Sequence, residues 1–383
     1  MPSSEKGTHM DYKVISADNH IIEAPHTFTT YLPKEYRDRA PRILRGADGG
    51  DGWSFDGKPP GKTFGLNAVA GRPFEDYKAS GLTVDEILPG NYDGAAHLKD
   101  MDADGVDAAT IYPMASLTSY TLDDRPFALA ILRAYNDWLL DEFCAVNPRR
   151  LIGLPLLPVD DGMDVLLAEL ERVAAKGAKG AFLPYWSERP YYDSYYEPLW
   201  TAAEQAPVTL CIHRTMGGKE PAGQATPRPE AAAGVNLAGI VQRFFTGVAP
   251  FSQLTFTGVF ERHPGLKFVD AEVNFGWLRF WALMMDQEFE RQKHWANPPL
   301  HTPPHEFIGK NLFVSVLDDF VGFEDAKRDP LVASAAMFSI DYPHSGTLFP
   351  KTQQYIAELT PGLDDDRKHA ILAGNAVRVF NLA

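Results

Sequence analysis

Short apolar runs recur along this chain, and helical patterns lie between most of them. Eight runs, most of them containing β-branched residues, are predicted as strands: residues 14–20, 108–114, 151–158, 180–186, 208–214, 267–273, 312–317 and 335–343. Apolar positions at helical spacing predict helices over residues 126–146, 163–176, 198–205, 231–248, 277–292, 351–359 and 365–373. Strands that alternate with helices in this way favour a (β/α)8 barrel, with a doubly wound parallel sheet as the alternative.

One long segment interrupts the alternation, between the first and the second predicted strand. Its middle, residues 46–90, is rich in Gly, Pro and Asp and includes a hairpin-like stretch at residues 53–58. Such long connections are usually functional or disordered. We expect an insertion at about residues 40–92 that, if ordered, forms a lid at the barrel mouth. We expect a single barrel domain over residues 11–383 that carries this insertion.

Two other segments, at the start of the chain and after the fifth predicted strand, lie outside the predicted helices and strands. Residues 1–10 end in Gly-Thr-His-Met and are expected to be an expression remnant, so they are left out of the site. Residues 217–229 form a second loop rich in Gly, Pro and Thr, directly after the fifth predicted strand. We expect both this loop and the insertion to determine the specificity for a substrate.

Composition narrows the classes of partner. The chain has 383 residues, of which 45% are hydrophobic, so it can bury a large core. Its formal net charge of −15 argues against nucleic acid or an anionic membrane as a partner and leaves a small-molecule substrate. No apolar stretch approaches the ~20 residues of a membrane span, and no signal peptide is visible. Cys144 and Cys211 lie in apolar segments, which indicates buried thiols in a reducing, cytoplasmic environment.

Metal-ligand residue types stand at the ends of three predicted strands. The first strand ends with Asp18 and His20, the fifth with His213, and the eighth carries Asp341 near its end. Asp18 and His20 are two positions apart, so they share one face of their strand, and in a barrel all these strand ends meet at one rim. Singly, such an Asp is more often a helix cap and such a His a core residue. Together, Asp18, His20, His213 and Asp341 predict the ligands of one divalent metal ion.

Two further residues are candidates for the catalytic chemistry beside Asp341. Glu272 ends the sixth predicted strand and would face the same mouth, where a carboxylate can orient or deprotonate water. The alternative for Glu272 is a salt bridge to Arg243 or Arg279. His344 follows Asp341 by three residues and is expected to assist it or to contact substrate, with loop packing as the alternative.

Two carboxylates near these positions are expected to have supporting roles. Glu23 lies three residues after His20, where it would support a ligand or form a helix-start or salt-bridge contact. Asp270 is two positions before Glu272, so it is expected to share the face of Glu272 one layer deeper and to be structural.

These segments resemble the amidohydrolase-related metal-dependent enzymes of the aminocarboxymuconate-semialdehyde decarboxylase type, over nearly all of residues 12–382. The matching segments are Asp18-x-His20-x-x-Glu23, residues 99–107, Ile212-His213, residues 258–267, Asp341-Tyr-Pro-His344 and residues 374–380. The resemblance implies a (β/α)8 barrel, one divalent metal ion and a homodimer or higher homo-oligomer. It also matches Asp18 and His20 to the first-strand ligand pair of the family, His213 to its fifth-strand ligand and Asp341 to its eighth-strand carboxylate.

The chain departs from the family pattern at two positions. The decarboxylases of the family place a catalytic His at the end of the sixth strand, where this sequence has Glu272. This difference argues against decarboxylation and favours water activation for hydrolysis. The first ligand is Asp18 rather than a His, which adds oxygen character, so Zn²⁺ is the favoured ion with Mn²⁺ or Mg²⁺ as alternatives.

The leading hypothesis from the sequence is a metal-dependent hydrolase of a small carbonyl or carboxylate substrate, cyclic or aromatic. A metal-activated water would attack, and Asp341 and Glu272 would handle protons. The alternative is a non-oxidative, metal-dependent decarboxylase of an aromatic or muconate-type acid, in which Asp341 protonates the ring carbon. A third hypothesis is a barrel that binds a ligand without turnover.

Overall fold

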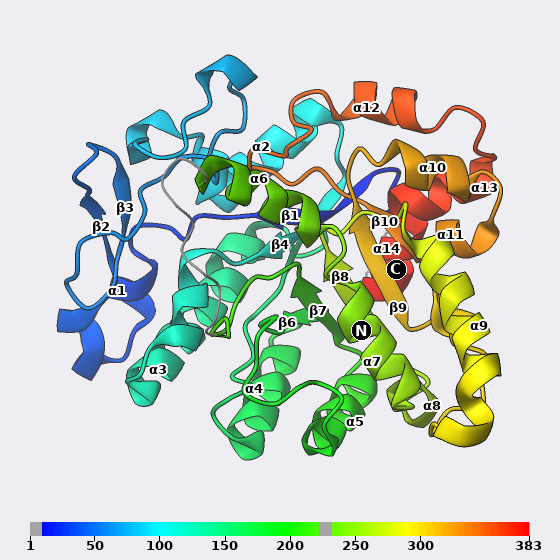
Figure 1. Ribbon diagram of the computed structural model, residues 1–383. Coiled ribbons are helices and arrows are strands. Elements are labelled where there is room, and N and C mark those ends of the chain that lie inside the picture. Colours follow the sequence, from blue (N-terminus) through cyan, green and yellow to red (C-terminus); the bar gives the residue numbers. More distant parts are fainter. Residues whose placement is uncertain (1–9, 222–231, 383) are drawn as a thin grey trace, which may run out of the picture.

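The computed structural model describes residues 10–221 and 232–382, and its centre is a barrel of eight parallel strands (Figure 1). In chain order the strands are β1 (Ile15–His20), β4 (Ala108–Tyr112), β5 (Leu151–Gly153), β6 (Gly180–Phe182), β7 (Thr209–His213), β8 (Phe268–Ala271), β9 (Leu312–Val316) and β10 (Ala336–Phe338). Each lies within one of the eight predicted runs, and the predicted (β/α)8 barrel is confirmed. Every residue of these strands is buried, because the helices cover their outer faces.

The hydrogen-bonded ladders fall into two groups, β1-β4-β5 and β6-β7-β8-β9-β10. One parallel bridge between Leu156 and Phe182 joins the groups after β5. A second bridge, between Asn19 of β1 and Tyr342, closes the circle beyond β10. The barrel is therefore held at two seams by short contacts rather than by full ladders.

The seam between β1 and the segment after β10 runs through predicted site residues. The backbone N–H of His20 donates to the carbonyl of Tyr342 at 2.5 Å, and that of Asp341 donates to the carbonyl of Asp18 at 2.9 Å. The first and last predicted ligand segments are thus joined by their own backbones, as the neighbouring positions of a first and an eighth strand require.

Helices surround the barrel (Figure 1). They include α2 (Gly94–Asp104), α3 (Arg125–Trp138), α4 (Met163–Ala175), α5 (Glu197–Gln205), α6 (Ala232–Arg243), α7 (Val248–Phe256), α8 (Val259–Arg262), α9 (Leu278–Ala296), α10 (Phe320–Ala326), α11 (Pro330–Ala335), α12 (Thr352–Leu359), α13 (Asp365–His369) and α14 (Asn375–Phe380). Local chemistry sets their ends: at α2, the Asp93 carboxylate accepts from the N–H of Ala96, and Gly105 ends the helix at φ 71°.

The sequence overestimated the length of several elements. The predicted helix at residues 126–146 is α-helical only as far as Trp138, and the predicted helix at residues 365–373 divides at His369. The predicted strand at residues 335–343 is shorter because α11 includes residue 335 and because the backbone becomes irregular after Phe338, so Asp341 lies three residues beyond β10. The helices α10 and α11, between β9 and β10, were not predicted, because they are too short to show a clear apolar period.

The insertion after β1 has its own ordered structure. Strands β2 (Arg42–Arg45) and β3 (Asp51–Ser54) form an antiparallel hairpin. The hairpin expected at residues 53–58 is instead the end of β3, at residues 53–54, and the turn that follows it. A separate small core gathers in the insertion, made by Ile22, Phe64, Ala68, Val69, Leu82 and Ile87. The N–H groups of Val69 and Ala70 both donate to the carbonyl of Pro343, at 3.0 and 3.1 Å. The insertion is thereby fixed against the loop that follows β10.

The structure also bears on the predictions for the cysteines, for membrane-spanning segments and for the two segments outside the barrel pattern. Cys144 and Cys211 are free and buried, as predicted. Within the described ranges, no helix is long and apolar enough to cross a membrane. The expected expression remnant lies outside the described residues except for Met10, and of the loop at residues 217–229 only residues 217–221 are described.

His97, on α2, supports the seam and gives the fold a pH dependence. Its Nδ1–H donates to the carbonyl of Gly90 at 2.8 Å, and its Nε2 accepts from Asn19 at 3.0 Å, so the ring is neutral. Burial lowers the pKa of His97 from 6.5 to about 4. The unfolded chain takes up a proton on His97 below pH 6.5, whereas the folded protein does so only near pH 4. The free energy of unfolding therefore falls by about 3 kcal/mol as the pH is lowered from above 6.5 toward 4.

We therefore expect His97→Gln to flatten the pH dependence of unfolding in this window. Urea unfolding measured at pH 7 and at pH 4.5, for the variant and the unmodified chain, checks this. An unchanged difference in unfolding free energy between the two pH values would assign the effect to other groups.

Candidate metal centre

Three predicted ligands converge inside the barrel mouth. The Nε2 atoms of His20 and His213 lie 3.0 Å apart, and each is close to Oδ1 of Asp18, at 3.2 and 3.3 Å. All three side chains are at most 1% exposed. The alternation in β1 places Asp18 and His20 on the same face as predicted, and β7 brings its last residue, His213, to them.

The electrostatics of this group suit a cation. Burial, together with the nearby His344, lowers the pKa of His20 to about 3, so its ring is neutral and carries a free lone pair. Burial opposes ionisation of Asp18, but the His213 and His20 rings outweigh it and hold the pKa of Asp18 well below its ordinary value. Among the described residues, Asp18 Oδ1 and Asp341 Oδ1 are buried without a hydrogen bond. Buried acceptors that face one another in this way fit a bound divalent cation.

The remaining predicted residues complete two overlapping groups of donors. Glu272 joins Asp18, His20 and His213, with its Oε2 3.5 Å from Nε2 of His213. Asp341 lies with His20 and His344, its Oδ1 3.5 Å from His20 Nε2 and 3.0 Å from His344 Nδ1. In each group the donor atoms lie within 4.8 Å of one another. Glu272, expected to handle protons, is therefore also placed to be a ligand.

The cationic partner of Glu272 is neither Arg243 nor Arg279, the two considered from the sequence. Glu272 forms an ion pair with Arg214, the residue after His213. The Arg214 guanidinium is largely buried and lies 5.5 Å from the centre of the Phe244 ring. Its Nε is buried and has no hydrogen-bond partner among the described residues. A buried cation thus stands beside the anionic donors at the mouth.

The backbone is turned at three of these positions. Arg214, Glu272 and Asp341 follow β7, β8 and β10 and have φ values of 38°, 58° and 50°. A left-handed conformation costs a residue with a side chain about 1–2 kcal/mol, and such conformations cluster at functional sites. The surrounding barrel must compensate for this cost.

The turned backbone changes which side chains face the centre. Two positions before Glu272, Asp270 points to the helices: its Oδ2 lies beside Gly247, and its Oδ1 accepts from the N–H of Arg214 at 3.1 Å. Burial raises the pKa of Asp270 well above its ordinary value. The expectation that Asp270 shares the face of Glu272 is wrong, because the positive φ of Glu272 breaks the alternation.

Two residues near the centre were not singled out from the sequence. The Tyr112 ring, at the end of β4, has its centroid 5.7 Å from that of His20 and 5.1 Å from that of His213. Ser315 of β9 accepts from the N–H of Glu272 at 2.7 Å, and its Oγ lies 3.4 Å from Asp18 Oδ2. Both are polar residues within predicted apolar strands, a signal that could have found them.

Glu23 anchors a neighbouring loop and does not reach the donors. Its buried carboxylate accepts hydrogen bonds from the N–H groups of Met114, Ala115 and Ser116 and from the Ser116 hydroxyl, the last at 2.6 Å. It therefore fixes the segment after β4 at the first turn of the 3-10 helix Ala115–Thr121. This is a helix-start contact with a distant helix, and among the described residues Glu23 forms no salt bridge.

We expect Glu23→Gln to reduce the free energy of unfolding by about 3 kcal/mol, because an amide turns its own donors toward this cluster of N–H groups. Chemical denaturation measures this loss. The exposed carboxylate of Glu35 provides the control, since Glu35→Gln should change stability by less than about 0.5 kcal/mol. Equal effects of the two substitutions would contradict the anchoring role.

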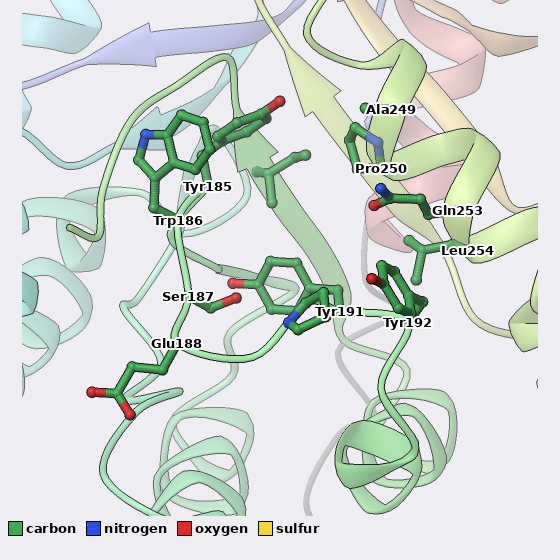
Figure 2. A pocket seen from close by; sticks show the side chains of 12 residues that line it. Tyr185, Trp186, Ser187, Glu188, Tyr191, Tyr192, Ala249, Pro250, Gln253 and Leu254 are labelled. Carbon is green, nitrogen blue, oxygen red and sulfur yellow. The ribbon is translucent and has the colours of Figure 1, made fainter. Parts of the chain in front are cut away.

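A pocket of about 300 Å³ lies outside the barrel, between the loop after β6 and α7. Figure 2 shows Tyr185 and Trp186 on one side of it and Pro250 and Gln253 on the other. Ile212 lines it, whereas the next residue, His213, faces the donors. No residue of the two donor groups lines this pocket, so it is separate from the metal centre.

The fold and the donor groups together define a metal-dependent enzyme of the amidohydrolase type. Residues 90–382 match the amidohydrolase family model, and the chain belongs to this family. The resemblance inferred from the sequence motifs is thereby confirmed. None of the curated protein sequences matches the chain.

Several solved structures share the fold. An amidohydrolase from Mycobacterium avium subsp. paratuberculosis K-10 aligns over 97% of this chain and 100% of its own, with TM-score 0.72 and 20% identity. A 5-carboxyvanillate decarboxylase from Sphingomonas paucimobilis aligns over 97% and 100%, with TM-score 0.66 and 19% identity. A dihydroxybenzoic acid decarboxylase from Polaromonas sp. JS666, with bound manganese and the inhibitor 2-nitroresorcinol, aligns over 97% of each chain, with TM-score 0.61 and 17% identity.

Proposed function

We propose that the protein is a metal-dependent, non-oxidative decarboxylase of an aromatic acid. Decarboxylation was the alternative from the sequence, and the similar structures favour it over hydrolysis, because they include decarboxylases of 5-carboxyvanillate and dihydroxybenzoate. Within the site, the position of Asp341 supports the proposal most strongly. Its Oδ1 lies between Nε2 of His20 and Nδ1 of His344, at 3.5 and 3.0 Å, so a proton carrier stands at the edge of the donor group.

Asp18, His20, His213 and Glu272 would hold the metal ion, with Asp341 close to it. When bound, a divalent cation supplies positive charge that binds the substrate carboxylate with an adjacent oxygen and stabilises negative charge on the ring. The neutral His20 imidazole leaves its lone pair free for this purpose, and the Asp18, Glu272 and Asp341 carboxylates would offset the charge. Manganese in a similar structure supports Mn²⁺ as a candidate beside Zn²⁺.

Decarboxylation consumes one proton in each turnover. The proton is added to the ring carbon that bears the carboxylate. The bond between this ring carbon and the carboxylate carbon then breaks, its electron pair returns to the ring, and CO₂ leaves. Asp341 would donate this proton, and His344, whose Nδ1 lies 3.0 Å from Asp341 Oδ1, would return a proton to Asp341.

Arg214 and Phe244 suit an aromatic acid at this mouth. One nitrogen of the Arg214 guanidinium forms the ion pair with Glu272. The buried Nε–H of Arg214 has no partner in the described residues and could donate a hydrogen bond to an anionic group of the substrate. The Phe244 ring, 5.5 Å from the guanidinium carbon, adds an apolar surface beside the charge. A planar substrate with a second oxygen or carboxylate group matches this combination.

Hydrolysis remains the second candidate, and Glu272 favours it. This carboxylate, 3.5 Å from His213 Nε2, stands where a base would accept a proton from water. Its substrate would be a lactone or an amide instead of a carboxylic acid.

The two candidates form different products, and this difference provides the test. The protein, supplied with Mn²⁺ or Zn²⁺, is incubated with a panel of hydroxybenzoates and, separately, with cyclic lactones and amides. Release of CO₂ with equimolar phenol is expected, with loss of this release in Asp341→Asn and no loss in the exposed control Asp366→Asn. Turnover of lactones or amides without CO₂ release from any acid would establish hydrolysis and overturn the proposal.

A further inference from the structure

A second cavity, of about 600 Å³, lies between the insertion and the loop after β4. Aromatic side chains from the insertion form one wall, namely Trp53, Phe55 and Phe64, and Met114 and Leu122 lie opposite. Most of its surface is apolar, and its volume is typical of sites for small organic ligands. No residue of either donor group lines it.

The walls of this cavity are held independently. Glu23 fixes Met114 and Ala115 through their backbone N–H groups, and both residues line the cavity. On the other side, Phe64 belongs to the small core of the insertion. The cavity is thus a space between two ordered segments.

Two lysines and one carboxylate line the cavity, so its lining carries a net positive charge although the whole chain carries a net charge of −15. Lys58 and Lys62 both line it and are exposed, and neither has an ion-pair partner within the described part of the chain. Asp56 is the acidic residue of the lining, and Arg39 pairs with it at 2.8 Å. Two exposed ammonium groups therefore stand beside an apolar, aromatic wall, and one of them, Lys58, also attracts the Asp56 carboxylate and helps to lower its pKa.

We propose that this cavity is a binding site for an organic anion with an aromatic body, such as an aromatic carboxylate larger than one ring. The rings of the ligand would be buried against Trp53, Phe55 and Phe64, and its carboxylate would lie at Lys58 and Lys62. Such a ligand would contact the insertion and the loop after β4 together, so its binding would stabilise their present arrangement. The site does not depend on the metal centre or on the proposed decarboxylation.

Titration of the full-length protein with 1-naphthoate, followed by calorimetry, tests the proposal. Lys58→Gln with Lys62→Gln should weaken binding about tenfold, the effect of two partly exposed charge pairs. The control, Lys34→Gln with Lys310→Gln, removes two exposed lysines that do not line the cavity and should leave the affinity unchanged. The neutral 1-naphthamide should bind at least tenfold more weakly than 1-naphthoate, and its affinity should be the same in both double variants.

Two results would overturn the proposal. The first is an equal affinity for 1-naphthoate in the two double variants, or no binding at millimolar concentration. The second is loss of binding when the metal is removed by a chelator, with the fold intact by circular dichroism, because the anion would then occupy the metal centre. Neither result affects the test of decarboxylation, which depends on CO₂ release.

Discussion

Replacement of His20 and His213 together by alanine is expected to remove the bound metal ion and to slow turnover on the order of 10³-fold. Their Nε2 atoms lie 3.0 Å apart and face the same Asp18 oxygen, so they form the centre of the donor group. Without them, three carboxylates would have to hold an ion in a buried site, which is unfavourable both for geometry and for charge. Loss of about 4 kcal/mol of charge stabilisation corresponds to a rate decrease on the order of 10³-fold.

The measurement is metal content by mass spectrometry, together with the rate of CO₂ release. The unmodified protein should hold about one ion per chain, and the double variant almost none. His301 provides the control, because its side chain is 93% exposed and lies in neither donor group. His301→Ala should retain both metal and activity. Full metal content in the double variant would show that these imidazoles are not the ligands.

The second large effect is expected from Asp341→Asn. The amide keeps the size of the side chain but cannot carry the proton, so the rate should fall by about 10²- to 10⁴-fold. Metal content should fall less than in the His variants, because Asp18, His20, His213 and Glu272 form a donor group without Asp341. His344→Gln should reduce the rate less than Asp341→Asn, since it removes the partner of the proton carrier and leaves the carrier in place.

Single-turnover measurement of CO₂ release separates the chemical step from product release in both variants. A rate in Asp341→Asn within threefold of the unmodified protein, at full metal content, would exclude Asp341 as the proton donor. A decrease in metal content that fully accounts for the decrease in rate would assign Asp341 to binding instead of proton transfer.

The barrel could be predicted from the sequence because most of its strands after β1 are apolar on both faces. Such runs stand out clearly, and their order along the chain fixes which strands are neighbours. The two-residue alternation also placed Asp18 and His20 correctly, although the pairing of β1 with β4 shifts register between Ser16 and Asn19. The ends of the runs were less informative, because β10 gives way to irregular backbone before Asp341 while the sequence stays apolar.

The orientation of Glu272, its ion-pair partner and the fold of the insertion could not be predicted from the sequence, because they depend on backbone turns and on contacts between distant parts of the chain. The face of Glu272 follows from a positive φ, and nothing in a Glu residue signals that conformation. Its pairing with Arg214 rather than Arg243 or Arg279 depends on how β7 and β8 end beside one another. Similarly, the fold of the insertion depends on its contacts with Pro343, hundreds of positions away along the chain.

The seam that closes the barrel has a consequence for synthesis on the ribosome. The N–H of Ile340 donates to the hydroxyl of Ser16, 324 positions earlier in the chain. On one side, β1 therefore cannot pair with the segment after β10 until nearly all of the chain has left the ribosome. Contacts so distant form late, because a long loop must be closed before they contribute. A nascent chain should therefore acquire its high-affinity metal site only when the last strand docks, and metal uptake would report that a barrel has been completed.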